Sequence, residues 1–299
     1  MTRFSKLYRR RFVFVYTWIA VLMLFFIVLR FIPIVSTFGL SLFRWELIKP
    51  NKPFIGLENY IKLTGDENFL EAIRNTTVFA FFVVTFSLVL SLMAALALEK
   101  KKFGGSFFET VYFLPYVIPI VPIALTWKWI YDPTSGLLNY LIGLVGMPKQ
   151  GWLINEALAL PSIMFMTVWQ RIGYNMVIFI VGLKAIPNEY FEAATIDGAG
   201  RWQAFKWITL PLLLPIVFYL VVINTIEAFR VFTQVYVMTT GAQGAPAAAV
   251  RVLVMDIYQN AFRFFHVGYA AAESVVLFLI ILIVSLIQFG LLGRRGGMR

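Results

Sequence analysis

The sequence predicts an all-α polytopic membrane protein with six transmembrane helices. Of its 299 residues, 60% are hydrophobic and only 14% are charged, whereas about 25% charged residues is usual in a soluble domain. A soluble protein of this composition would expose large apolar patches. The apolar residues are also gathered in six long segments, each near the roughly 20 residues that a helix needs to cross a bilayer.

The six expected spans follow one another with polar connections between them. Apolar residues are distributed around every face of each segment, as is typical of helices surrounded by lipid. A helix satisfies its own backbone hydrogen bonds, which lipid requires, and the ten-residue alternation of a β-barrel is not seen. The expected spans are 12–34, 75–98, 107–131, 158–183, 210–230 and 270–292.

An even number of spans places both ends of the chain on one side of the membrane. Basic residues are concentrated in the short segments on that side, which is normally the cytoplasmic side. We therefore expect cytoplasmic termini and longer external loops at 44–74, 132–156 and 231–269. The basic residues concerned are Arg3, Lys6, Arg9, Arg10, Arg11, Lys100, Lys101, Lys102, Lys184, Arg201, Lys206, Arg294, Arg295 and Arg299.

Composition also excludes several functions. The chain has no cysteine and one histidine, His266, so thiolate chemistry and multi-histidine metal sites are excluded. It has no phosphate-binding loop of the Gly-x-x-x-x-Gly-Lys-Ser/Thr type, so we expect no nucleotide hydrolysis by this chain. Its net charge of +11 suits contact with anionic lipid, and we expect no nucleic-acid partner. A membrane enzyme would need a carboxylate pair, and Asp132 and Glu156 are isolated from each other in the sequence.

A polar segment at 184–209 interrupts the apolar pattern, and the expected orientation places it in the cytoplasm. Glutamate and alanine favour helices, so a short helix is expected over 192–199. Pro187 suits the start of this helix. Gly198 and Gly200 permit a sharp turn at its end.

A second short helix is expected after this turn, from about Trp202. Phe205 and Ile208 follow Trp202 at intervals of three, so the three side chains share one face. Pro211 then lies near the start of the fifth span, where the missing N–H of proline matters least. Two short helices joined by a glycine turn would form a knob on the membrane surface, although an ordinary interfacial hairpin has the same pattern.

The order of residues in this segment is more specific than its helix pattern. Glu192-Ala193-Ala194 is followed after three residues by Gly198 and, nine residues later, by Ile-x-Leu-Pro ending at Pro211. This spacing resembles the signature of the permease subunits of bacterial binding-protein-dependent ABC importers. The triplet Asp197-Gly198-Ala199 is similar to that of the sugar and polyol branch. Further similar stretches are 54–60, 114–116, Trp169 with 173–174, and 182–187.

The resemblance implies a type I ABC importer permease fold with a cytoplasmic coupling helix, as a single domain over 1–299. Such a chain forms half of a sugar pathway across the inner membrane, is not an enzyme and binds no cofactor or metal. A second related permease would complete the pathway as a heterodimer. Two ATPase subunits would bind ATP and Mg, and an external solute-binding protein would deliver the cargo.

The resemblance also assigns residues to ATPase coupling. Glu192 would hold the loop through charge-assisted hydrogen bonds, the following alanines would allow close packing, and Gly198 would form the turn. The full set implied is Glu192, Ala193, Ala194, Asp197, Gly198, Ala199, Gly200 and Pro211.

Polar residues deep in lipid are costly, so they tend to face a pathway or a partner. In maltose-type relatives the sugar contacts lie on the fourth and fifth spans. The resemblance therefore implies a substrate pathway at Thr167, Gln170, Arg171, Tyr174, Asn224 and Thr225.

Arg171 departs from the small residue of the maltose type, which favours an anionic or larger solute. A glycerol-3-phosphate or polyol importer is thus an alternative. In other interpretations Arg171 pairs with Glu227, and Asn224 bonds a neighbouring helix. An ATP-independent secondary transporter or channel is the remaining alternative, and such folds often contain broken helices.

Overall fold

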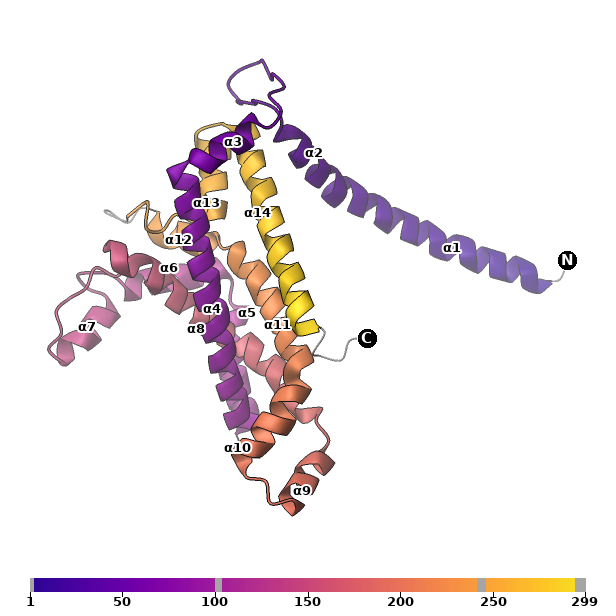
Figure 1. Cartoon of the computed structure of the whole chain (residues 1–299), viewed down its shortest axis with the longest axis vertical. Helices are drawn as coiled ribbons and strands as arrows, with labels where there is room; N and C mark the ends of the chain where they lie inside the picture. The colour runs from indigo at the N-terminus through magenta and orange to yellow at the C-terminus, as the bar shows by residue number, and fades with distance from the viewer. Residues whose placement is uncertain (1–2, 100–103, 241–245, 294–299) are drawn as a thin grey trace. The chain divides into compact units, whose positions relative to one another are not determined.

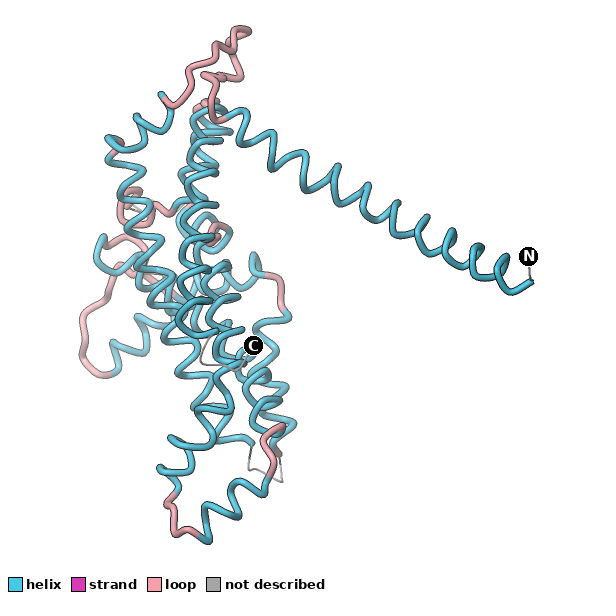
Figure 2. Tube along the Cα trace, turned by 45° about the vertical axis from the view of Figure 1, so that its right-hand side comes forward, coloured by secondary structure: helices cyan, strands magenta, loops and turns pink. Residues whose placement is uncertain are grey.

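The computed structural model describes residues 3–99, 104–240 and 246–293. Helices make up most of this part of the chain, and it holds no strand beyond an isolated bridge between Phe43 and Phe54 (Figure 2). The chain forms two compact units, which consist of 1–64 with 257–276 and of 65–256 with 277–299. The basic residues expected to fix orientation at Lys100, Lys101, Lys102, Arg294, Arg295 and Arg299 lie outside the described residues.

The main element of the first unit is one long N-terminal helix. It consists of α1 (Arg3–Phe26), a wider π-helical turn at Ile27–Phe31 and α2 (Ile32–Leu40) (Figure 1). Its most apolar window holds no buried residue, as expected of a helix that faces lipid or a partner. The helix includes the expected first span and continues beyond it.

The segment that follows the N-terminal helix is connected by hydrogen bonds to Asn59, which lies at the start of α3 (Glu58–Gly65). Its buried Nδ2 donates to the backbone oxygens of Ser41 at 2.8 Å and Phe43 at 3.1 Å. The hydroxyl of Tyr60 lies 2.6 Å from Ser41 Oγ. Because a buried amide needs such partners, these contacts give a physical reason for the Asn-Tyr pair of the 54–60 stretch.

The second unit holds most of the other helices. In chain order the remaining elements of the described chain are α4 (Glu67–Glu99), α5 (Gly105–Val117), α6 (Ile120–Ile130), α7 (Leu137–Leu144), α8 (Glu156–Lys184), α9 (Asn188–Ile196), α10 (Arg201–Ala204), a π-helical turn (Phe205–Thr209), α11 (Leu210–Phe229), α12 (Thr233–Thr239), α13 (Leu253–Tyr258), another π-helical turn (Gln259–Arg263), α14 (Val267–Gln288) and a final π-helical turn (Phe289–Gly293).

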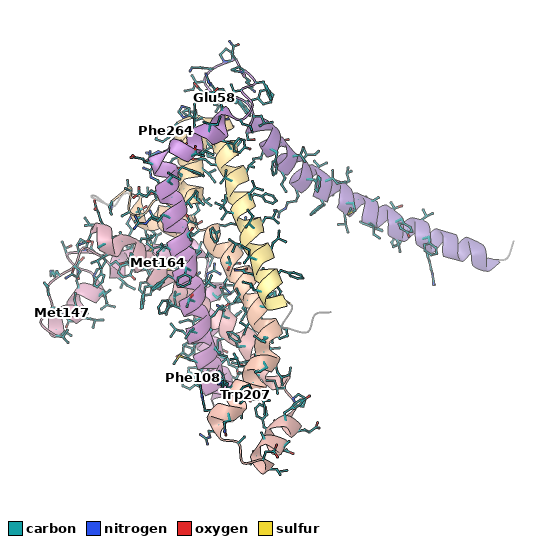
Figure 3. The ribbon with its side chains drawn as sticks, viewed as in Figure 1. Glu58, Phe108, Met147, Met164, Trp207 and Phe264 are labelled. Atoms are coloured by element: carbon teal, nitrogen blue, oxygen red, sulfur yellow. The ribbon has the colours of Figure 1, made fainter. Side chains whose placement is uncertain are left out.

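Helix α8 is the centre of the second unit, packed against α4, α5 and α11 (Figure 1). Met164 lies inside the bundle, whereas Trp207 points outward (Figure 3). Two glycines let the neighbouring helices approach closely. A Cβ at Gly173 would lie 1.9 Å from the backbone oxygen of Tyr112 in α5, and a Cβ at Gly182 would lie 2.1 Å from Ile216 Cδ1 in α11.

The expected third span is not one helix. It is divided into α5 and α6, which are bent by 96° relative to each other. Ile118 and Pro119 between them are extended, with ψ of 134° and 143°. Proline disfavours the helical conformation of the residue before it and has no N–H to continue the helix. The described residues thus contain five helices suited to spanning, or six if the bent pair is one span.

Candidate functional site

The polar segment between α8 and α11 folds into the predicted helix and turn, with shifted boundaries. Pro187 is extended and precedes α9, which begins at Asn188 and ends at Ile196 rather than covering 192–199. Glu189 lies in the first turn, where a negative charge interacts favourably with the helix dipole. The Glu-Ala-Ala triplet therefore forms the middle of α9.

Gly198 ends α9 in a left-handed conformation with φ of +74°. Its N–H donates to the Thr195 oxygen at 3.1 Å, and the Ala199 N–H donates to the Ala194 oxygen at 2.8 Å. These two bonds define a Schellman motif, in which glycine is preferred at the left-handed position. The spacing from Ala194 to Gly198 thus follows from the geometry of this helix end.

The second short helix is not separate from the fifth span, which corrects the expected boundary at 210. Helix α10 starts after Gly200, whose N–H donates to Gln203 Oε1 at 2.7 Å, and the helix continues without a break to Phe229. A π-helical turn at Phe205–Thr209 precedes Pro211. Such a wider turn changes the hydrogen-bond register, so proline can be accommodated within a continuous helix.

The outward face of this segment is exposed and partly apolar. Ile196 is 87% exposed, and Trp202 is also exposed and stacks on Phe205 with a centroid distance of 5.5 Å. The Glu192 side chain is exposed and has no hydrogen-bond partner within the described residues, so its expected partners are not found in this part of the chain. Exposed apolar groups beside polar ones are typical of a docking surface.

The fourth and fifth spans meet at a polar cluster. Arg171 Nη1 of α8 forms an ion pair with Glu227 of α11 and lies 3.3 Å from Asn224 Oδ1. The Asn224 amide donates to Asn175 Oδ1 at 3.0 Å and receives a weaker bond in return at 3.4 Å. The Arg171 side chain is only 13% exposed and that of Glu227 is 44% exposed. The charge of Arg171 is therefore balanced inside the chain.

Tyrosines extend this cluster along its accessible side. The ring of Tyr174 stacks on Tyr116 of α5 with a centroid distance of 4.6 Å. Its hydroxyl lies 3.2 Å from that of Tyr219 in α11. The sequence interpretation did not include Tyr116 or Tyr219 in the pathway. The available signal was weak, because both are isolated polar aromatics in apolar spans.

The remaining expected pathway residues differ in accessibility. Gln170 is partly exposed beside Arg171. Thr167 is buried, and its hydroxyl donates to the Ile163 oxygen at 2.8 Å within α8. Thr225 is also buried, and its Oγ1 accepts from Gln288 Nε2 at 2.9 Å. The structure thus brings Arg171 and Asn224 together, and the buried Asn224 amide joins α11 to α8 through Asn175, as the alternative interpretation expected. Both threonines lie in helix packing.

No cluster of three potential metal ligands occurs in the residues that the structure describes. The Asp132 carboxylate accepts bonds from Ser135 N at 2.8 Å and Thr134 Oγ1 at 2.7 Å. These bonds, led by that of the Ser135 backbone, hold the pKa of Asp132 well below its ordinary value. A carboxylate engaged in this way is a poor general base near neutral pH.

A bundle of apolar, span-length helices with a polar cluster between two of them and an exposed polar loop is typical of a membrane transport subunit. The family described as "Binding-protein-dependent transport system inner membrane component" matches residues 87–295. The chain belongs to this family. The permease resemblance stated from the sequence is confirmed.

Curated relatives match over most of their length. The chain is 38% identical to the "Probable ABC transporter permease protein YurN" of Bacillus subtilis, over 89% of this chain and 91% of that protein. It is 32% identical to the "Trehalose/maltose transport system permease protein MalF" of Thermococcus litoralis, over 89% of each. It is 33% identical to the "sn-glycerol-3-phosphate transport system permease protein UgpA" of Escherichia coli, over 79% of each.

The fold agrees with that of a solved transporter. A crystal structure of a bacterial ABC transporter involved in import of the acidic polysaccharide alginate contains a chain with a TM-score of 0.84 and 22% identity, covering 98% of this chain and 99% of that one. This likeness confirms the importer permease fold.

Proposed function

We propose that this chain is the permease subunit of an ATP-driven importer for a sugar or related carbohydrate. The observation that carries the proposal is the complete Glu-Ala-Ala signature on an exposed helix that ends in a Schellman turn. Membership of the permease family and the names of the sugar-transport relatives support it. The chain would form half of the pathway for a solute delivered by an external binding protein.

The coupling residues act together in this proposal. Glu192 and Ala193 lie on the exposed part of α9 and contact an ATPase subunit, while Ala194, Gly198 and Ala199 form the turn that fixes the direction of the helix. The remaining residues of the set are Asp197, which precedes the turn, Gly200, which precedes α10, and Pro211, which lies in the first turn of α11 within the continuous helix. Two ATPases hold ATP and Mg, and a second permease completes the pathway.

Orientation can be tested because the chain has no native cysteine. A single cysteine at the highly exposed Ile196 is expected to react with a membrane-impermeant maleimide only in inverted vesicles, since α9 lies in the cytoplasm. Leu144→Cys, in the exposed α7 of an external loop, is the matched control and should react in intact cells. Labelling of Ile196→Cys in intact cells would contradict the orientation and the coupling assignment.

The polar cluster supports a neutral polyhydroxylated solute. Tyr174 and Tyr116 offer aromatic surface, and the partly exposed Gln170 offers an amide group one residue from Arg171. Arg171 gives no unbalanced positive charge, because Glu227 pairs with it. An anionic solute would meet the more exposed carboxylate of this pair, so the pairing favours a neutral solute, while the likeness to UgpA keeps the glycerol-3-phosphate subtype as the alternative.

Arg171→Ala is expected to lower uptake of a labelled solute about tenfold or more without changing the yield of co-purified ATPase. The variant leaves the Glu227 carboxylate without its partner, and removing one charged hydrogen-bond partner costs about 1.5–3 kcal/mol. Arg230→Ala is the control, since Arg230 is exposed at the end of α11. Unchanged uptake would remove Arg171 from the site. Uptake that persists without ATP would instead indicate a channel or secondary transporter.

A further inference from the structure

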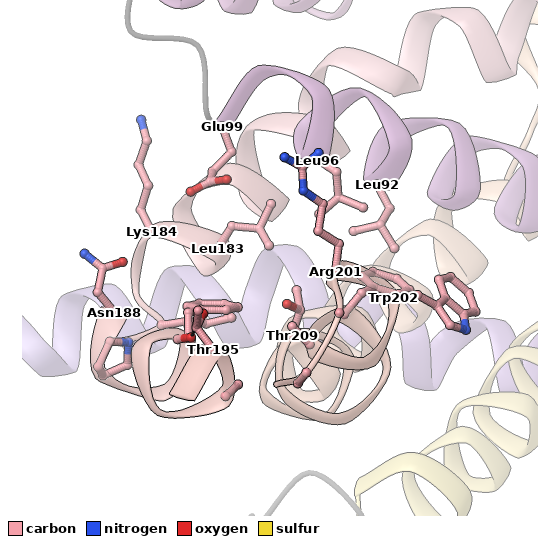
Figure 4. Close-up of a pocket in the computed structure, with 18 of the residues that line it drawn as sticks. Leu92, Leu96, Glu99, Leu183, Lys184, Asn188, Thr195, Arg201, Trp202 and Thr209 are labelled. Carbon is pink, nitrogen blue, oxygen red and sulfur yellow. Dashed lines mark hydrogen bonds between the residues drawn. The ribbon is translucent and has the colours of Figure 1, made fainter. Parts of the chain in front are cut away.

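A groove of about 1240 Å³ lies beside α9, the proposed coupling helix. Helix α4 and the end of α8 line one side of it, and α9, α10 and the following π-helical turn line the other (Figure 4). The strongly exposed Ile196 of α9 does not line it. The groove therefore lies on the inner side of this loop, where it includes Ala194, Ala199 and Gly200 of the proposed coupling set, whereas the outward face with Ile196 is left to ATPase docking.

The groove combines an apolar wall with a charged rim. Lys184 at the end of α8 and Arg201 at the start of α10 supply two positive charges, and Glu99 at the end of α4 supplies one negative charge (Figure 4). The apolar lining includes Val89, Leu92, Met93, Leu96, Phe191 and Phe205. Such a groove suits an amphiphile with an apolar chain and an anionic head.

The two basic side chains are available for a ligand. Lys184 Nζ lies 3.9 Å from Glu109 Oε1, and its side chain is 60% exposed, so this contact is a weak surface ion pair. Arg201 is exposed and forms no ion pair with the described residues. Arg201 is therefore the basic group of the rim whose charge no ion pair within the described residues balances.

We infer that this groove binds an anionic phospholipid from the cytoplasmic leaflet. Lys184 and Arg201 would hold the phosphate, and one acyl chain would lie along Leu92 and Leu96 of α4. The inference rests on the proposed orientation, which places the ends of α4 and α8 at the inner surface. Basic pockets between spans on that side are suited to anionic headgroups, and burial of an acyl chain adds a favourable apolar contribution.

Bound lipid would connect α9 with the spans. Helix α9 has no buried residue of its own, and among its side chains Phe191 both lines the groove and packs on the hydrophobic core of α4, α8 and α11. A lipid chain in the groove would extend this contact. The position of the coupling helix would then depend on the anionic lipid content of the inner leaflet.

The test uses the full transporter complex purified in mild detergent, stripped of lipid and titrated with dioleoylphosphatidylglycerol or dioleoylphosphatidylcholine. Native mass spectrometry counts the bound lipids. The wild type is expected to prefer phosphatidylglycerol. The Lys184→Gln/Arg201→Gln double variant should bind it about 25-fold more weakly, because each basic residue near an anionic membrane surface contributes about fivefold.

Lys206→Gln is the matched control, because Lys206 is exposed in the adjoining π-helical turn and does not line the groove. It should bind phosphatidylglycerol as the wild type does. Equal binding of the two lipids by the wild type, or equal phosphatidylglycerol binding by the wild type and the double variant, would overturn the inference. Because the readout is lipid binding, that outcome would leave the transport proposal intact, whereas failed ATPase assembly in the wild-type chain would contradict the transport proposal alone.

Discussion

Replacing Gly198 with aspartate is expected to reduce ATP-driven uptake to background while the chain still inserts into the membrane. Gly198 has φ of +74°, where a side chain is strained by about 1–2 kcal/mol. A Cβ there would meet no atom within 4 Å, so crowding is not the reason. The new carboxylate would follow Asp197 at the negative end of the α9 dipole and would add charge to the docking face.

Two control variants separate charge from strain. Gly198→Asn keeps a residue that tolerates the left-handed conformation and adds no charge, so it should retain most uptake. Gly146 follows α7 and has the same geometry, with φ of +78° and the same pair of closing bonds, to Gly143 and Ile142. Gly146→Asp should therefore cause a similar local strain without affecting coupling.

The measurements are uptake of labelled solute by energised cells, the amount of chain in the membrane and the yield of co-purified ATPase. Normal ATPase yield and normal uptake with Gly198→Asp would show that α9 is not the docking helix. Equal losses with Gly146→Asp would show that the defect is general instability rather than lost coupling.

Gly173→Ala is expected to destabilise the packing of α5 on α8 by about 3 kcal/mol or more, the upper end of what overpacking costs. The added Cβ would lie 1.9 Å from the Tyr112 oxygen and 2.7 Å from Phe113 Cα. These are backbone atoms, so the contact can be relieved only by moving the helix. Because α5 carries Tyr116, the displacement would also separate Tyr116 from Tyr174.

Two other glycines provide a graded comparison. A Cβ at Gly182 would meet the side chains of Ile216 and Leu213, which can change rotamer, so Gly182→Ala should cost less. Gly143 in α7 has no atom within 4 Å of the added Cβ, and its alanine variant should be neutral or slightly stabilising. The midpoints of thermal unfolding in detergent give the order of stability of the three alanine variants. Equal midpoints for the three variants would contradict the proposed close contact.

The general architecture could be predicted because its signals are local in the sequence. Long apolar segments specify helices in lipid whatever their neighbours are, and the described structure contains five such helices and a bent pair. The turn at Gly198 was predicted for the same reason, since a Schellman motif involves only residues close in sequence.

Two helix boundaries predicted from the sequence were wrong, and each lies near a proline. Pro119 was read as lying within an apolar helix, yet it ends α5 and forces the 96° bend to α6. Broken helices of this kind are frequent in secondary transporters, so this feature does not by itself distinguish the two classes of transporter. Pro211 was expected to mark a helix start, but the π-helical turn before it allows α10 to continue into α11.

The sequence by itself determined that this is a helical membrane permease with a Glu-Ala-Ala loop, because hydropathy and residue spacing are properties of the chain alone. Only the tertiary structure decided which polar residues share a site. Arg171 and Glu227 are separated by 56 residues, and no sequence rule fixes how α8 and α11 are rotated against each other. That rotation depends on packing, including the close contacts at Gly173 and Gly182, and it brings Arg171 to its counter-charge.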